Sequence, residues 1–129
     1  LENLSVYSDF DVYGHLDYVV RYGPKKDEGY SYKMYQEVFD EILKRIVDMK
    51  KGIELNTAGL AKGLREPNPC AAVLKRYREL GGEIVTVGSD AHAPGQIAHA
   101  FGQACEILKE CGFGYYATYK KRKPIYHAI

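Results

Sequence analysis

The feature of this chain that most limits its fold is a regular alternation of strand-like and helix-like segments. Strand-like apolar runs occupy residues 10–14, 52–57, 83–89 and 115–119, and segments with helical periodicity lie between them at 34–47, 68–80 and 95–111. Such alternation is typical of right-handed strand–helix–strand units, which place their strands in one parallel sheet. We therefore expect an α/β fold with a parallel sheet and alternating helices, formed as a single domain over residues 1–129.

The helical segments carry recognisable start and stop signals. Between residues 34 and 47, apolar residues recur in pairs every four positions and form one continuous stripe. Ser31 is the expected N-cap of this helix. For the next helix we expect Asn68 at the N-cap, Pro69 at the first helical position and Gly81 at the end.

Polar residues that can carry chemistry cluster where the first three strands end. His15 follows the first strand, Glu54 and Asn56 lie at the end of the second, and Asp90 and His92 follow the third. The carboxyl ends of parallel strands form one rim, where ligands bind in such folds. Alternate residues of extended backbone share a face, so we expect Glu54 to lie beside Asn56 and Asp90 beside His92.

These side chains are of the types that bind transition metals. Imidazole nitrogens and carboxylate oxygens suit zinc, manganese and iron, so His15, Asp90 and His92 are candidate metal ligands. Other interpretations remain open. Asp90 is also suited to capping the following helix. His92 is equally suited to a turn before Pro94, and His15 could form a buried hydrogen bond with Asp17.

Basic residues near this rim are candidates for binding phosphate. Arg21 lies six positions after His15, and arginine recognises phosphate through two parallel hydrogen bonds. Lys62 and Arg65 on a later loop are weaker candidates, and a loop arginine is also commonly just solvated. We interpret the basic run at 120–123 as a solvated tail.

Composition excludes several classes of partner. A net charge of +1 argues against a nucleic-acid binder but allows a small phosphorylated substrate. No apolar run is long enough to span a bilayer, and no signal peptide is recognisable, so we expect no membrane partner. The three cysteines include no C-x-x-C motif, which favours reduced thiols and a cytoplasmic location.

Three segments together resemble a known family over nearly the whole chain and in the same order. They are "DVYGHLDYVVRYG" (11–23), "GIELNTAGL" (52–60) and "EIVTVGSDAHAPGQIAHAFGQACEILKECGF" (83–113). They are similar to the carboxyl-terminal half of histidinol phosphatases of the polymerase and histidinol phosphatase (PHP) superfamily. The resemblance implies a distorted (β/α)7 TIM-like barrel with two or three divalent metal ions at its carboxyl-terminal rim.

The same resemblance implies roles for individual residues. His15, Asp90 and His92 match metal-ligand positions of the family, and Arg21 matches a residue that contacts substrate phosphate. The implied reaction is the hydrolysis of L-histidinol phosphate to L-histidinol and phosphate in histidine biosynthesis. Either Asp90 or a metal-bound water is the expected proton source for the leaving group, and the sequence does not choose between them.

The chain departs from the family in one large respect. It contains no His-x-His pair, which in the family comes from the amino-terminal half of the barrel. We therefore expect a fragment with an incomplete site, weak metal binding and little activity. Two alternatives remain: another PHP phosphoesterase, such as a polymerase-associated nuclease, or a non-catalytic fragment that forms homodimers through exposed strand edges.

Overall fold

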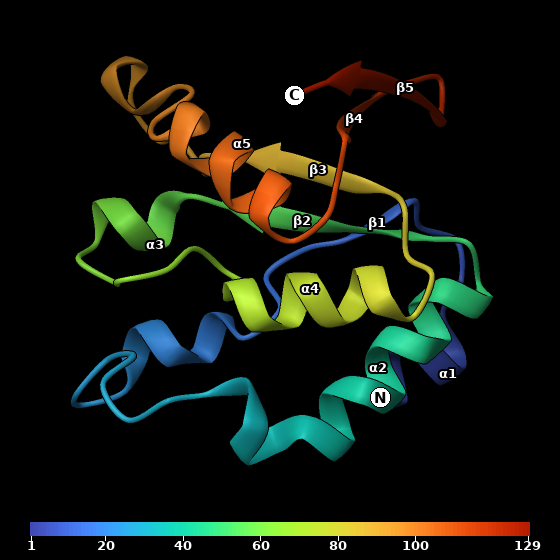
Figure 1. Cartoon of the computed structure of the whole chain (residues 1–129), viewed down its shortest axis with the longest axis horizontal. Coiled ribbons are helices and arrows are strands. Elements are labelled where there is room, and N and C mark those ends of the chain that lie inside the picture. The colour runs from blue at the N-terminus through green and yellow to red at the C-terminus, as the bar shows by residue number, and fades with distance from the viewer.

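A computed structural model describes residues 1–129 and has the expected α/β architecture (Figure 1). Strands β1 (Val12–Tyr13), β2 (Gly52–Asn56) and β3 (Val85–Gly88) form a parallel sheet in the order β1-β2-β3. The prediction of a parallel sheet is confirmed for these three strands. Because all three run in the same direction, their carboxyl ends meet at one edge of the sheet.

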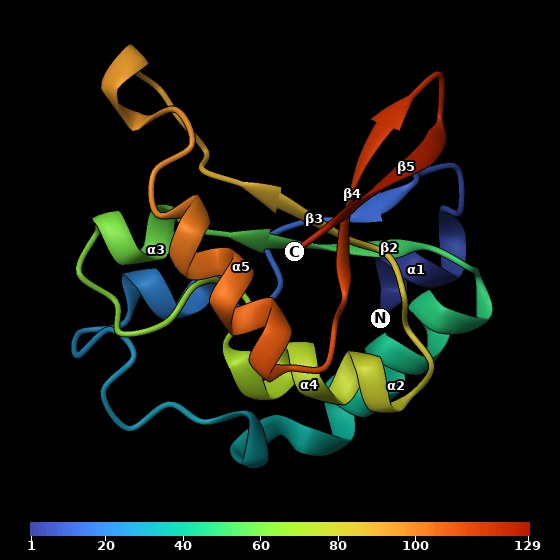
Figure 2. The same ribbon diagram turned by 45° about the horizontal axis from the view of Figure 1, so that its top comes forward.

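Helices connect these strands and cover the sheet. The main helices are α2 (Gln36–Asp48), α4 (Ala71–Glu79) and α5 (Phe101–Glu110), the short ones are α1 (Glu2–Val6) and α3 (Ala58–Ala61), and 3₁₀ turns occupy Tyr18–Tyr22, Tyr32–Tyr35 and Pro94–Gln96. In both views, α2 and α4 lie on one side of the sheet (Figures 1 and 2). None of the helices is long and apolar enough to cross a membrane.

One core lies between the sheet and the helices. The stripe predicted along α2 is only partly buried, because Phe39, Leu43 and Ile46 pack inward while Val38 remains 51% exposed. The largest fully buried apolar side chains of the core come from the sheet and from the helices α2, α4 and α5. They are Leu43, Ile46, Ile53, Leu55, Val73, Leu74, Tyr77, Val85 and Leu108.

All three predicted helix starts differ from the structure. Helix α4 begins at Ala71 with Cys70 at the N-cap, whereas Asn68 is buried and its side chain is bound to other polar groups. The third helix begins at Phe101 rather than at 95, since Ala98 and Ala100 adopt left-handed backbone angles that interrupt helical hydrogen bonding. Ser31 precedes a 3₁₀ turn that leads into α2, and its side chain makes no capping hydrogen bond.

The last predicted strand does not join the parallel sheet. Strand β4 (Tyr115–Lys120) pairs antiparallel with β5 (Lys123–Ala128) in a separate hairpin, which stands on the opposite side of the sheet from α2 (Figure 2). Lys121 and Arg122 form the two-residue turn with positive φ angles, as tight hairpins require. The run at 120–123 is exposed, as expected, but it is not a tail, and Arg122 also hydrogen-bonds the Asp11 carboxylate.

Candidate functional site

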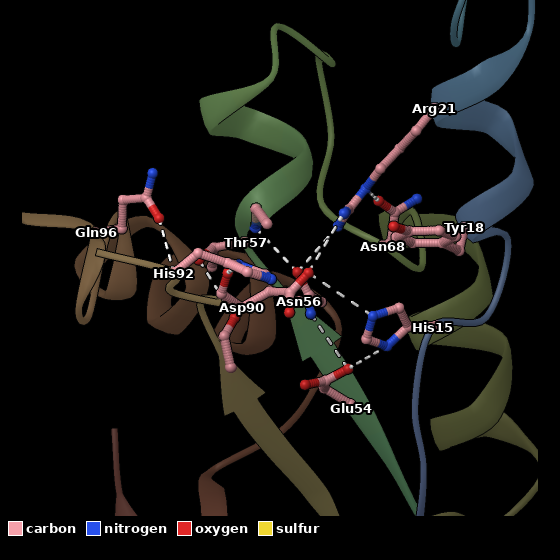
Figure 3. Close-up of polar contacts among 12 residues, drawn as sticks. His15, Tyr18, Arg21, Glu54, Asn56, Thr57, Asn68, Asp90, His92 and Gln96 are labelled. Atoms are coloured by element: carbon pink, nitrogen blue, oxygen red, sulfur yellow. Dashed lines mark hydrogen bonds and ion pairs between the residues drawn. The ribbon is translucent and has the colours of Figure 1, made fainter. Parts of the chain in front are cut away.

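Three strand ends bring a histidine between two carboxylates. Nδ1 of His15 lies 3.3 Å from Oε2 of Glu54, and Nε2 lies 3.8 Å from Oδ2 of Asp90 (Figure 3). These residues follow β1, lie within β2 and follow β3, respectively, as the strand-end argument predicts. The His15 side chain is 45% exposed, so the imidazole is accessible from solvent.

The prediction that Glu54 and Asn56 lie on the same face of β2 is confirmed. The Asn56 amide donates a hydrogen bond of 3.3 Å to Oε2 of Glu54. The alternative of a buried hydrogen bond between His15 and Asp17 is wrong, because the Asp17 carboxylate accepts its hydrogen bonds from Tyr30, Asn68 and Cys70 instead.

Arg21 is buried beside this cluster rather than solvated. Its side chain is only 3% exposed and stacks over the ring of Tyr18 at 4.4 Å. Nε donates to Oδ1 of Asn68 at 2.7 Å, and Nη2 donates to Oδ1 of Asn56 at 3.0 Å. Nη1 has no hydrogen-bond partner and lies 3.7 Å from Oδ2 of Asp90 (Figure 3). A buried donor without a partner is costly, which suits this nitrogen to an anionic ligand.

Behind Arg21, a network of buried polar groups holds the two asparagines in place. The backbones of Asn56 and Asn68 exchange hydrogen bonds of 2.7 and 3.0 Å. The Asn68 amide also donates to Asp17 at 2.6 Å, and the Cys70 N–H donates to the same carboxylate at 2.9 Å. Burial raises the pKa of Asp17, although these hydrogen bonds act in the opposite direction. Burial also raises the pKa of the Cys70 thiol to about 11, so this thiol is not activated.

The His92 ring contacts the backbone of Asp90 but makes no hydrogen bond or ion pair with the side chains of the other predicted ligands. Asp90 adopts a left-handed backbone conformation with φ of 50°, so the segment is not extended and the expectation that Asp90 and His92 share a face is wrong. Nδ1 of His92 contacts the Asp90 carbonyl oxygen at 2.7 Å, and the backbone N–H of His92 donates to Oε1 of Gln96. No hydrogen bond or ion pair joins the His92 ring to His15 or Arg21. Asp90 caps no helix, because a 3₁₀ turn with Ala93 at its N-cap comes next.

The weaker phosphate candidates lie outside the cluster. Arg65 is bound to Asp27, with its backbone N–H 2.8 Å from Oδ2, and Lys62 is exposed. By contrast, sequence reasoning missed Asn68. An asparagine before a proline at the start of a helix indicates an N-cap, and no sequence signal links it to Arg21.

The donor atoms fit a transition metal in type but do not form a complete site. Imidazole and carboxylate groups of His15, Glu54 and Asp90 are suitable ligands for zinc, manganese or iron. However, no group of three His, Cys, Asp or Glu side chains is arranged to hold a metal ion. Further ligands are required to complete a metal centre at this rim.

Comparisons with known proteins give one consistent result, although no family model matches the chain. A probable histidinol-phosphatase of Thermotoga maritima is 37% identical over 113 residues, which are 88% of this chain and 46% of that protein. A probable histidinol-phosphatase of Clostridium acetobutylicum is 40% identical over 101 residues, covering 78% of this chain and 39% of that protein.

A solved structure has the same fold. The crystal structure of histidinol phosphate phosphatase from Lactococcus lactis, complexed with zinc, L-histidinol and phosphate, matches with a TM-score of 0.80 and 28% identity. The match covers 96% of this chain and 47% of that one. The chain spans about half the length of the curated relatives it matches. Over nearly its whole length, the chain is therefore homologous to the histidinol-phosphatases.

Proposed function

We propose that this chain is part of a metal-dependent phosphomonoesterase that hydrolyses L-histidinol phosphate to L-histidinol and phosphate, a reaction of histidine biosynthesis. Homology to histidinol-phosphatases supports the substrate. The observation that carries the proposal is the buried Arg21, whose Nη1 has no hydrogen-bond partner and lies 3.7 Å from the Asp90 carboxylate, which also faces His15. This arrangement suits a phosphate group bound next to a metal ion.

In this proposal, His15, Asp90 and His92 are metal ligands, and the remaining ligands of a site with two or three ions come from outside the chain. Their nitrogen and oxygen donors suit zinc, manganese and iron, and zinc is the metal named for the Lactococcus lactis relative. When bound, such ions supply a nucleophile near neutral pH by lowering the pKa of water, and they stabilise charge on phosphoryl oxygens.

Arg21 and Asp90 have distinct tasks in the proposed reaction. The guanidinium of Arg21 is oriented by two neutral amide oxygens, and its Nη1, which has no hydrogen-bond partner, remains available to the oxygens of the phosphoryl group. Nη1 would donate to one of these oxygens. Oδ2 of Asp90 faces both Nη1 of Arg21 and Nε2 of His15, from where it can hold a metal ion or pass a proton to the leaving alkoxide oxygen.

The proposed setting is the carboxyl-terminal half of one distorted (β/α)7 barrel, with residues 1–129 forming part of a single PHP domain. The 47% share of the Lactococcus lactis structure covered by this chain supports a half-domain. We also propose a cytoplasmic location, in keeping with the three free cysteines.

A second candidate is a fragment that self-associates. A groove of about 580 Å³ between the 3₁₀ turn Tyr18–Tyr22 and α2 is lined mainly by apolar side chains, including Val19, Met34 and Val38. All three are more than half exposed. The outer strands β1 and β3 each have one free edge. A polymerase-associated nuclease is less favoured, because the net charge is only +1.

The direct test is phosphate release by the full-length protein with zinc. We expect hydrolysis of histidinol phosphate at enzymatic rates and no cleavage of single-stranded DNA. Residues 1–129 alone should bind zinc weakly and release little phosphate, because too few ligands are present. His92→Ala in the full-length protein should reduce zinc content and activity together. Unchanged zinc content in this variant would contradict the ligand role of His92, and DNA cleavage would favour the nuclease.

A further inference from the structure

Glu54 occupies a slot between two glycines at the ends of the neighbouring strands. A Cβ atom on Gly14, just after β1, would lie 3.1 Å from Oε2 of Glu54. A Cβ atom on Gly88, the last residue of β3, would overlap with Oε1 of Glu54. The carboxylate therefore takes up space that any larger residue at position 88 would occupy. The two glycines leave room for the carboxylate at this point of the rim.

Oε2 of Glu54 faces two nitrogen atoms. The Asn56 amide nitrogen donates to it at 3.3 Å, and Nδ1 of His15 lies at the same distance of 3.3 Å. An ionised carboxylate can only accept hydrogen bonds, so this contact is favourable when Nδ1 of His15 carries the proton. The lone pair of the neutral imidazole is then on Nε2, which is the nitrogen directed toward Asp90 (Figure 3).

We propose that Glu54 is a positioning residue that fixes the Nδ1–H tautomer and the ring orientation of His15, so that Nε2 is available as a metal ligand. Metal-binding histidines commonly donate their second ring N–H to a carboxylate, which sets the tautomer and strengthens the ligand. This inference rests on the proposed metal role of His15. It assigns to Glu54 a task that differs from direct contact with metal or substrate.

The test is the tautomer of His15, measured in the ¹⁵N-labelled, metal-free chain by long-range ¹H–¹⁵N NMR at a pH where the imidazole is neutral. We expect the proton on Nδ1 in the parent chain. Glu54→Ala removes the acceptor and should shift the population toward the Nε2–H tautomer. Glu83→Ala is the matched control, because the Glu83 side chain is 75% exposed and distant in sequence from His15. It should leave the parent spectrum unchanged.

A second variant moves the carboxylate without removing it. Gly88→Ala places a methyl group in the slot, so the flexible end of Glu54 must move away. We expect the same shift toward Nε2–H. Gly102→Ala has no neighbouring atom within 4 Å and should leave the tautomer unchanged. A parent chain with the proton on Nε2, or variants at positions 54 and 88 that keep the parent tautomer, would overturn the proposal.

Zinc affinity of the full-length protein provides a separate measurement. Glu54→Ala should weaken zinc binding by about 10- to 100-fold, as loss of such a partner typically does, whereas Glu83→Ala should not. The NMR result requires neither metal nor substrate. Failure of histidinol phosphate hydrolysis would therefore count against the proposed function alone, and a wrong tautomer would count against the role of Glu54 alone.

Discussion

At the scale of single residues, the unusual group is Arg21, because both of its hydrogen-bond acceptors are neutral amide oxygens. Buried arginines are generally paired with carboxylates, which compensate their charge. Here Asn56 and Asn68 accept the hydrogen bonds, and the nearest carboxylate oxygen, on Asp90, is 3.7 Å from Nη1. The amide oxygens fix the direction of the guanidinium, and the ion pair with Asp90 is too long to be a hydrogen bond, so Nη1 keeps a free N–H that is suited to binding an anion.

Asn68 should be important for stability, since its amide joins Arg21 to Asp17. Asn68→Ala leaves a buried donor and a buried acceptor without partners, and we expect a loss of roughly 3 kcal/mol in the free energy of unfolding. Urea denaturation measures this loss. The matched control is Asn3→Ala at an exposed position, which should change stability by less than about 0.5 kcal/mol. Equal effects of both substitutions would show that the Asn68 network contributes little.

Strand-end reasoning predicted part of this site and missed the rest for identifiable reasons. His15, Glu54 and Asp90 were predictable because parallel strands bring their carboxyl ends together. The shared face expected of Asp90 and His92 was wrong because Asp90 turns into the left-handed region, which an aspartate tolerates and a sequence pattern does not reveal. The link from Arg21 to Asn68 spans 47 positions and depends on tertiary packing.

At the scale of elements, periodicity located the helices and the three parallel strands but could not assign the last strand. A run such as "YYATY" has the same pattern in a parallel sheet and in a hairpin. What decides is the two-residue turn at Lys121 and Arg122, whose positive φ angles are not signalled by glycine or asparagine. Helix periodicity likewise did not distinguish the buried side of the α2 stripe from its exposed side.

Two substitutions on α2 should separate these two sides. Leu43 is fully buried, and Leu43→Ala should lower the free energy of unfolding by about 2–5 kcal/mol through the cavity that it creates. Val38 is 51% exposed, and Val38→Ala should cost less than about 1 kcal/mol. Chemical denaturation of both variants tests this difference. Similar losses would mean that the whole stripe is buried.

The contact between α2 and α4 should depend on pH. Two hydrogen bonds from Arg76 to Asp40, at 3.0 and 2.8 Å, lower the pKa of this carboxyl from 3.8 to about 2. Because the folded pKa lies below the unfolded value, the ionised carboxylate stabilises the fold above about pH 4, and this contribution is lost as pH falls toward 2.

Urea midpoints measured between pH 5 and pH 2 test this contribution, and Asp40→Asn should make the decline in stability across that range shallower. Asp48→Asn, at an exposed position of the same helix, is the control and should retain the parent decline. If Asp40→Asn also followed the parent curve, the Asp40–Arg76 contact would not contribute to acid sensitivity.

At the scale of the whole molecule, the chain spans about half the length of the histidinol-phosphatases it matches, and several large apolar side chains are exposed on its surface. We expect self-association of the isolated chain through the groove beside α2, visible in light scattering as a mass near twice 14.6 kDa. Val38→Glu should shift this mass toward the monomer, because it places a charge in the apolar groove. A monomer at high micromolar concentration would exclude such association.

The most direct test of a phosphate-binding Arg21 is the steady-state kinetics of the full-length protein on histidinol phosphate. Arg21→Lys replaces the guanidinium group with an ammonium group and so removes Nη1. We expect kcat/KM to fall by about 10- to 100-fold, which corresponds to the loss of one charge-assisted hydrogen bond. Arg65→Lys, at a 69% exposed side chain, should retain the parent value. Circular dichroism checks that both variants are folded. A folded Arg21→Lys variant with unchanged kcat/KM, or a zinc-loaded parent that releases no phosphate, would contradict the phosphatase site proposed for this rim.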